Sequence, residues 1–176
     1  RINKSSAAFS FDKLRWLNGE HIRELSPESF HELACSYYPE GLKTIDLEKL
    51  SQLIQIRTEN LSEIPDLVAF FVDLPSYESD LFLHQKSKST LESSQLVLRQ
   101  VHPLLASLDE WTNESLFAQL KAFAQEQGLK VGTVMWPIRT ALSGQETSPG
   151  GATELAALLG KDETLRRIRL GLEKLS

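Results

Sequence analysis

The sequence contains a single cysteine, Cys35, among 176 residues, and it lacks any long apolar run. One cysteine excludes an internal disulfide framework and favours a reducing compartment. A membrane-spanning helix needs about 20 consecutive apolar residues, and no stretch here approaches that length. No targeting segment is visible, and the chain starts mid-pattern at Arg1. We therefore expect a piece of a longer cytoplasmic protein with no membrane partner.

A basic excess is also missing. The formal net charge is −5; residues 1–77 carry 8 basic and 12 acidic residues, and residues 78–176 carry 11 and 12. A protein that coats nucleic acid nonspecifically needs a strong basic excess. The composition argues against such a coat, and we expect no DNA partner.

The motifs that mark enzymes and metal centres are absent as well. Neither GxGxxG nor GxxxxGK[ST] occurs, and no serine lies in a GxSxG setting. Cys35 lies in an apolar helical pattern, which predicts a buried structural thiol. No histidine has a partner at metal-ligand spacing. We expect no catalytic residue, no metal site and no bound cofactor in this chain. The four scattered histidines are His21, His31, His84 and His102.

Helical periodicity is what the sequence does contain. Ser26 with Pro27, and Thr112 with Glu114, read as helix starts, and Gly128 reads as a helix end. The pair Asn18-Gly19 reads as an interruption. No alternating strand pair stands out. The pattern predicts an all-α fold of roughly ten helices in two small bundles in tandem, over residues 1–77 and 78–176. The boundary is expected near the start of the polar, serine-rich segment at residues 76–94.

The stretch "MWPIRTALSGQETSPGG", residues 135–151, combines an arginine with two turn motifs. Pro137 interrupts an apolar helical pattern, Arg139 follows it, and "SG" and then "SPGG" end it. One interpretation is structural: Pro137 starts a short helix, Arg139 is a surface charge and "SPGG" is a plain turn. The other is that Arg139 and the turn form a binding site.

Residues 130–168, "KVGTVMWPIRTALSG" through "LLGKDETLRRI", resemble the anticodon-binding region of bacterial glutamyl-tRNA synthetases. "RINKSSAAFSFDKLRWLNGEHIREL" and "IRTENLSEIPDLVAFF" resemble the same family, so the similarity covers essentially the whole chain. The family's HIGH and KMSKS motifs and its nucleotide-binding core are absent. The resemblance implies a chain that holds the tRNA anticodon arm while another part activates glutamate.

The resemblance gives two arginines a role at the anticodon. It implies that Arg139 lies near the anticodon bases and that Arg57 reads the third anticodon base. That base is cytosine in glutamate tRNA and guanine in glutamine tRNA. A guanidinium can bind phosphates and base edges and can stack on a base. Exposed backbone N–H groups of the "SPGG" turn can read a splayed base. The turn residues are Ser148, Pro149, Gly150 and Gly151, the last replacing a bulkier apolar residue of some members. Alternatively, Arg57 is a solvated charge on an amphipathic helix.

The resemblance also implies that the N-terminal segment contacts the tRNA stem. The residues concerned are Lys13, Arg15, Trp16 and Asn18. Alternatively, Trp16 belongs to the core and the basic residues line a solvated face. Arg166, Arg167 and Arg169 are weaker phosphate-binding candidates, because cationic residues late in a helix also suit its dipole.

Two functions from different classes remain. The first is a tRNA anticodon-binding module, whose partners are glutamate tRNA and an upstream catalytic domain of the same chain that uses ATP and magnesium. The second is a helical protein-interaction scaffold without RNA binding. The acidic charge favours the second function, and the motifs at both ends of the chain favour the first.

Overall fold

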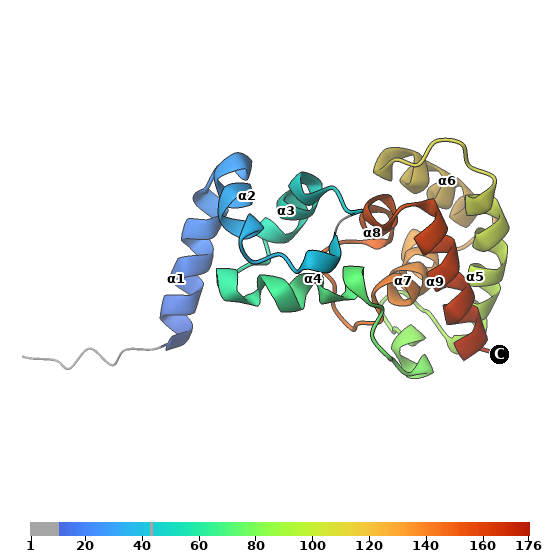
Figure 1. Ribbon diagram of the computed structural model, residues 1–176. Helices are drawn as coiled ribbons and strands as arrows, with labels where there is room; N and C mark the ends of the chain where they lie inside the picture. The colour runs from blue at the N-terminus through green and yellow to red at the C-terminus, as the bar shows by residue number, and fades with distance from the viewer. Residues whose placement is uncertain (1–10, 43) are drawn as a thin grey trace, which may run out of the picture.

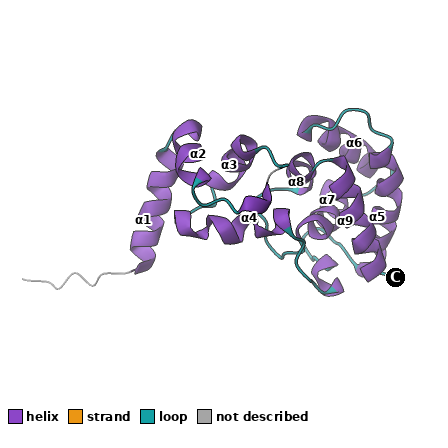
Figure 2. Ribbon diagram, viewed as in Figure 1, coloured by secondary structure: helices purple, strands orange, loops and turns teal. Residues whose placement is uncertain are grey.

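The computed structural model describes residues 11–42 and 44–176, and this part consists of helices and loops (Figure 2). It holds nine α-helices and three short 3-10 helices; its only β pairing is an isolated antiparallel bridge between His84 and Ser89. The all-α prediction is confirmed. Residues 1–10 of the N-terminal motif lie outside the described residues. The elements are α1 (Phe11–Glu24), α2 (Pro27–Cys35), η1 (Glu40–Leu42), α3 (Leu47–Gln55), η2 (Leu61–Glu63), α4 (Ile64–Val72), η3 (Ser79–Phe82), α5 (Leu91–Ala106), α6 (Asn113–Glu126), α7 (Val131–Ser143), α8 (Ala152–Leu159) and α9 (Lys161–Lys174).

The predicted helix ends follow local capping chemistry. The Ser26 side chain accepts a hydrogen bond from the Ser29 N–H at the start of α2, and Thr112 accepts one from the Ser115 N–H at the start of α6. Gly128 follows α6 with φ of 63°, in the left-handed region that glycine tolerates best. These boundaries were readable from sequence because each depends on residues within one helical turn.

Asn18 and Gly19 do not interrupt a helix, and that prediction is wrong. α1 runs through both residues without a break. A Cβ added at Gly19 would lie 3.3 Å from Cγ of Glu59, and the Asn18 side-chain amide donates to the Glu59 carbonyl. The pair therefore lets the loop after α3 approach α1 closely, and it does not form a turn.

Cys35 is exposed, so the prediction of a buried thiol is also wrong. Phe30 and Ala34 occupy the buried face of α2, and Cys35 lies one residue beyond that face at the helix end. Its Sγ lies 3.5 Å from Nε2 of His31.

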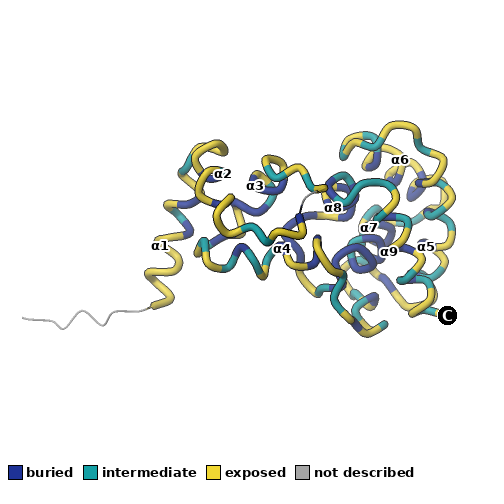
Figure 3. The backbone as a smooth tube through the Cα atoms, in the orientation of Figure 1, coloured by how far each residue is buried: buried dark blue, intermediate teal, exposed yellow. Residues whose placement is uncertain are grey.

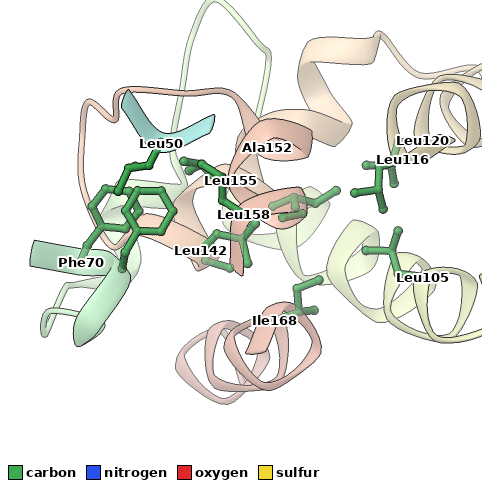
Figure 4. Close-up of a cluster of buried hydrophobic side chains, with 14 of the residues drawn as sticks. Leu50, Phe70, Leu105, Leu116, Leu120, Leu142, Ala152, Leu155, Leu158 and Ile168 are labelled. Atoms are coloured by element: carbon green, nitrogen blue, oxygen red, sulfur yellow. The ribbon is translucent and has the colours of Figure 1, made fainter. Parts of the chain in front are cut away.

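The helices form two groups. Helices α1–α4 lie on one side of the molecule and α5–α9 on the other (Figure 1). α2 packs on α3 in the first group, while α5, α7 and α9 pack on one another in the second. The buried apolar residues of both groups belong to one cluster. Figure 3 shows that buried positions occur along the backbone of each group. Figure 4 shows members from each, including Leu50 and Phe70 of α3 and α4, and Leu142 and Leu155 of α7 and α8. The division between residues 77 and 78 stays a prediction.

A buried arginine connects the two groups. Arg167 of α9 is 0% exposed, and its Nη1 donates to the carbonyl oxygens of Phe70 at 2.8 Å and Leu142 at 2.6 Å. These carbonyls lie in the last turns of α4 and α7. The last four carbonyl oxygens of a helix have no hydrogen-bond partner within the helix. The structure therefore removes Arg167 from the phosphate-binding candidates, because its donors serve helix C-termini inside the protein.

Glu163 completes this cluster from one turn earlier on α9. Hydrogen bonds from Arg166 and Arg167 lower the pKa of Glu163 to about 2. A carboxyl whose pKa is lower in the folded state stabilises the fold above its unfolded pKa of about 4.3, and loses that contribution as the pH falls toward the folded value.

We expect the Glu163→Gln variant to be less stable than the wild type at neutral pH, because glutamine loses the charge while keeping the shape. The difference should shrink as the pH falls from about 4.3 toward 2, where the wild-type carboxyl also becomes neutral. Urea unfolding followed by circular dichroism at several pH values measures it. A difference that is the same at all pH values would contradict the assignment.

Candidate nucleic-acid interface

Helix α7 carries the first candidate arginine, and it continues through the proline that the sequence suggested as a boundary. Pro137 lies inside α7 and is buried, so it does not start a separate short helix. The helix ends at Ser143, and Gly144 follows with φ of 61°. A Cβ at Gly144 would lie 2.7 Å from Cδ1 of Tyr77. Glycine is therefore required there both by the backbone and by the close approach, and it directs the chain into the loop 145–150.

Arg139 reaches from α7 to this loop. Its Nη1 donates to Oγ of Ser148 at 3.0 Å, and its Nη2 donates to the carbonyl of Glu146 at 2.9 Å. The side chain is half-buried. Burial lowers the pKa of Arg139, and the neighbouring charge of Arg57 lowers it further. A guanidinium stays charged in proteins regardless, so this is a partly desolvated cation fixed at the turn.

The turn itself is rigidly packed. Oγ of Ser148, a residue that is 8% exposed, donates to the Gly150 carbonyl at 2.8 Å. Leu53 of α3 lies against Gly150, where an added Cβ would come within 2.9 Å of Cδ2 of Leu53. The Gly151 N–H donates to Oε2 of Glu154 at 2.7 Å, which caps α8. The Gly151 N–H is therefore already bonded to a side chain of α8. Of the backbone N–H groups of the turn that the sequence suggested for reading a base, this one is not available.

Arg57 approaches the same turn from the other group of helices. It follows the end of α3, is exposed, and its Nε donates to the Pro149 carbonyl at 3.1 Å. Arg57 and Arg139 therefore flank one turn although they are far apart in the chain. Within residues 11–42 and 44–176, neither forms a salt bridge with a carboxylate. The two guanidinium groups lie close enough for the charge of Arg57 to act on Arg139, and the charge of Glu146 acts on Arg139 in the opposite sense.

The candidate stem-contact residues lie on α1. Trp16 is 56% exposed, so it is not a core residue. Arg15 pairs with Glu59 at 2.7 Å and with Glu63 at 2.8 Å. Hydrogen bonding with Glu59 and the charge of Glu63 raise the pKa of Arg15. Lys13 and Asn18 are exposed on the same helix. Arg15 is already engaged by acids, so a phosphate there would compete with two carboxylates.

Two further residues at the site were missed by the reading of the sequence. The guanidinium carbon of Arg139 lies 4.2 Å from the centre of the Trp136 ring, and the His84 ring stacks on Trp136 at 3.6 Å with a 3° angle between the planes. Trp136 and Arg139 are three residues apart on a helix, a spacing that places side chains next to each other. That spacing identifies Trp136 in retrospect. No local pattern identifies His84.

The described part of the chain offers no group of His, Cys, Asp and Glu side chains that could hold a metal ion. None of its helices is long and apolar enough to cross a membrane.

Comparison with known proteins gives a consistent set of relatives. Residues 29–172 match the family described as "Anticodon binding domain". Glutamate–tRNA ligases of Clostridium tetani and Clostridium acetobutylicum are 48% and 45% identical over 99% of this chain, which spans 36% of their length. The crystal structure of a glutamate tRNA ligase from Elizabethkingia meningosepticum in complex with its amino acid has the same fold, with TM-score 0.74, 24% identity, and coverage of 96% of this chain and 33% of that one. Glutamate-tRNA synthetase from Elizabethkingia anophelis gives a TM-score of 0.67 at 23% identity, over 94% of this chain and 32% of that one.

Proposed function

Because this chain belongs to the family of anticodon-binding domains, we propose that it recognises a tRNA anticodon, and that the tRNA is the one that accepts glutamate. In this proposal an upstream catalytic domain of the same protein, using ATP and magnesium, attaches the amino acid while this chain holds the RNA. The function belongs to translation in the cytoplasm.

The observation that carries the proposal is the position of the two arginines. Arg57, which follows α3, and Arg139 of α7 both donate hydrogen bonds to the loop that contains Ser148 and Pro149. Sequence-specific proteins read RNA mainly at single-stranded loops, whose bases are turned outward and bind to arginine planes or donors. Two fixed guanidinium groups on one turn suit such a loop.

The charge distribution fits a local contact with RNA. The chain as a whole carries −5, so long-range attraction to a polyanion is weak. Among the described residues, Arg57 and Arg139 form no salt bridge with a carboxylate, so their guanidinium groups can bind phosphate and base acceptors. We therefore expect this chain alone to bind RNA weakly and to depend on a few contacts.

The α1 residues take a secondary role. We propose that Lys13, Arg15, Trp16 and Asn18 contact the tRNA stem. An exposed tryptophan beside cations offers stacking and phosphate binding together. The family match argues against a helical protein-interaction scaffold without RNA binding.

We expect Arg139→Ala to weaken binding of a synthetic stem–loop RNA that carries the glutamate anticodon. The loss should be about fivefold, because a partly exposed guanidinium contributes on the order of 1 kcal/mol. Fluorescence anisotropy with labelled RNA at low salt measures the affinity. Unfolding by urea shows whether the variant retains its fold.

Arg99→Ala is the matched control, since it removes the same charge from an exposed position on α5. Equal losses for the two variants would mean that net charge, and not the site, governs binding. Absence of binding by the wild-type chain would refute the proposed function.

A further inference from the structure

We propose that His84 is a positioning residue for Arg139. Through the ring of Trp136, His84 holds the guanidinium in the orientation that meets the RNA. The inference rests on the proposed function of the site and adds to it a residue from a segment with no diagnostic sequence pattern.

The three side chains form one stack. The centre of the His84 ring lies 3.6 Å from that of Trp136, with the planes 3° apart, and the Arg139 guanidinium lies 4.2 Å from the same indole. Two groups of this size at these distances cannot share one face of a ring. The indole therefore lies between the imidazole and the guanidinium, and its position determines where Arg139 can stack.

His84 is held by the backbone of a short hairpin. Its N–H donates to the Ser89 carbonyl at 3.0 Å, and the Ser89 N–H donates back to the His84 carbonyl at 3.0 Å. The Ser87 N–H donates to Nδ1 of His84 at 3.3 Å. Oγ of Ser87 lies 2.8 Å from the same nitrogen. These contacts hold the imidazole ring in place, and its flat face is suited to face-to-face contact with indole.

The hairpin is in turn fixed to the start of α7. Oγ1 of Thr133 donates to the Ser87 carbonyl at 2.6 Å, and Gly132 lies against Ser87, where an added Cβ would be 3.4 Å from Oγ. The imidazole is therefore tied to the same helix that carries Trp136 and Arg139. A movement of the hairpin would displace the His84 ring from the Trp136 indole.

The indole is fixed at its edge as well. Nε1 of Trp136 donates to the Leu81 carbonyl at 3.1 Å. With its edge bonded and one face covered by His84, the ring presents its other face to Arg139. Arginine has many rotamers, and restricting them before binding lowers the entropy cost of each contact that it makes with RNA.

Two substitutions separate the ring of His84 from its hydrogen bond. His84→Gln removes the ring and keeps a side chain with an acceptor oxygen, while His84→Phe keeps a flat ring and removes the acceptor. If the ring positions Arg139, His84→Gln should weaken binding of the glutamate anticodon stem–loop by about two- to fivefold, the size of a cation–π contact at a partly exposed site. His84→Phe should bind nearly as well as the wild type.

A second readout reports the stack without RNA. The Nε–H resonance of Arg139 in a proton–nitrogen NMR spectrum is shifted by the ring current of Trp136. It should move toward the position of an exposed arginine in His84→Gln, and stay in place in His84→Phe and in the hairpin control Gln85→Ala. In an Arg139→Ala background, His84→Gln should cause no further loss of RNA affinity.

The inference is wrong if His84→Gln leaves both the resonance and the affinity unchanged, or if the two His84 variants lose affinity equally. It is also wrong if His84→Gln costs as much without Arg139 as with it. If the wild-type chain does not bind the RNA, the proposed function fails; in that case the NMR shifts still decide whether His84 positions Arg139.

Discussion

Replacement of Arg167 by methionine is expected to lower the free energy of unfolding by about 2–6 kcal/mol, because it leaves two buried carbonyl oxygens without a donor at about 1–3 kcal/mol each. Methionine fills a similar volume but donates no hydrogen bond. The carbonyl oxygens of Phe70 and Leu142, which accept from Arg167, would stay buried without a donor. These acceptors belong to α4 and α7, so the variant should weaken the connection between the two groups of helices.

Arg166→Met provides a matched control in the adjacent residue. Arg166 bonds to the same Glu163 carboxylate, but its side chain is 49% exposed, against 1% for Arg167. Exposed ion pairs contribute about 0–1 kcal/mol, so Arg166→Met should change stability far less. Urea unfolding of both variants at neutral pH makes the comparison. Similar losses of stability in the two variants would show that the buried hydrogen bonds of Arg167 do not stabilise the contact between the two groups of helices.

Arg167 also shows where sequence reasoning stops. It lies on the face of α9 that includes the buried residues Thr164, Ile168 and Gly171, so the helical pattern places it toward the interior. Its charge nevertheless favoured a solvent or phosphate role. The partners that make burial possible are carbonyls of α4 and α7, far away in the chain. A pattern within one helix cannot reveal them.

The candidate site was predictable to different degrees. Arg139 and Ser148 are nine residues apart, and the helix end with its glycine suggests that they lie close together. The bond between Arg57 and Pro149 spans 92 residues, and only the family resemblance placed both at one site. His84 was outside either kind of reasoning, because a hairpin in a polar segment brings it to Trp136. Capping residues within one helical turn made the helix ends predictable from sequence. Contacts between distant helices could be identified only from the three-dimensional structure.

Arg57→Gln is expected to reduce the preference for cytosine over guanine at the third anticodon base by about tenfold to a hundredfold. This corresponds to the 1–3 kcal/mol of a good base contact, by analogy with duplex readout. The Nε of Arg57 donates to the Pro149 carbonyl, which orients the guanidinium and leaves its Nη donors for a ligand. Cytosine offers O2 and N3 as acceptors, whereas guanine presents N1–H and an amino group on the same edge.

Donor facing donor leaves polar groups unpaired, which is costly once water is excluded. Glutamine carries both a donor and an acceptor, so it tolerates either base, and the preference should narrow mainly through weaker binding of the cytosine RNA.

The assay uses two stem–loop RNAs that differ only at the third anticodon base, bound to wild-type and variant chains. Arg57→Lys is the matched control: it keeps the positive charge but replaces the planar fork by a single ammonium group. If Arg57 reads the base, lysine should lose most of the preference while keeping more of the overall affinity than glutamine. An unchanged ratio of affinities in a folded Arg57→Gln chain would mean that Arg57 is a surface charge beside the anticodon site and does not read the base.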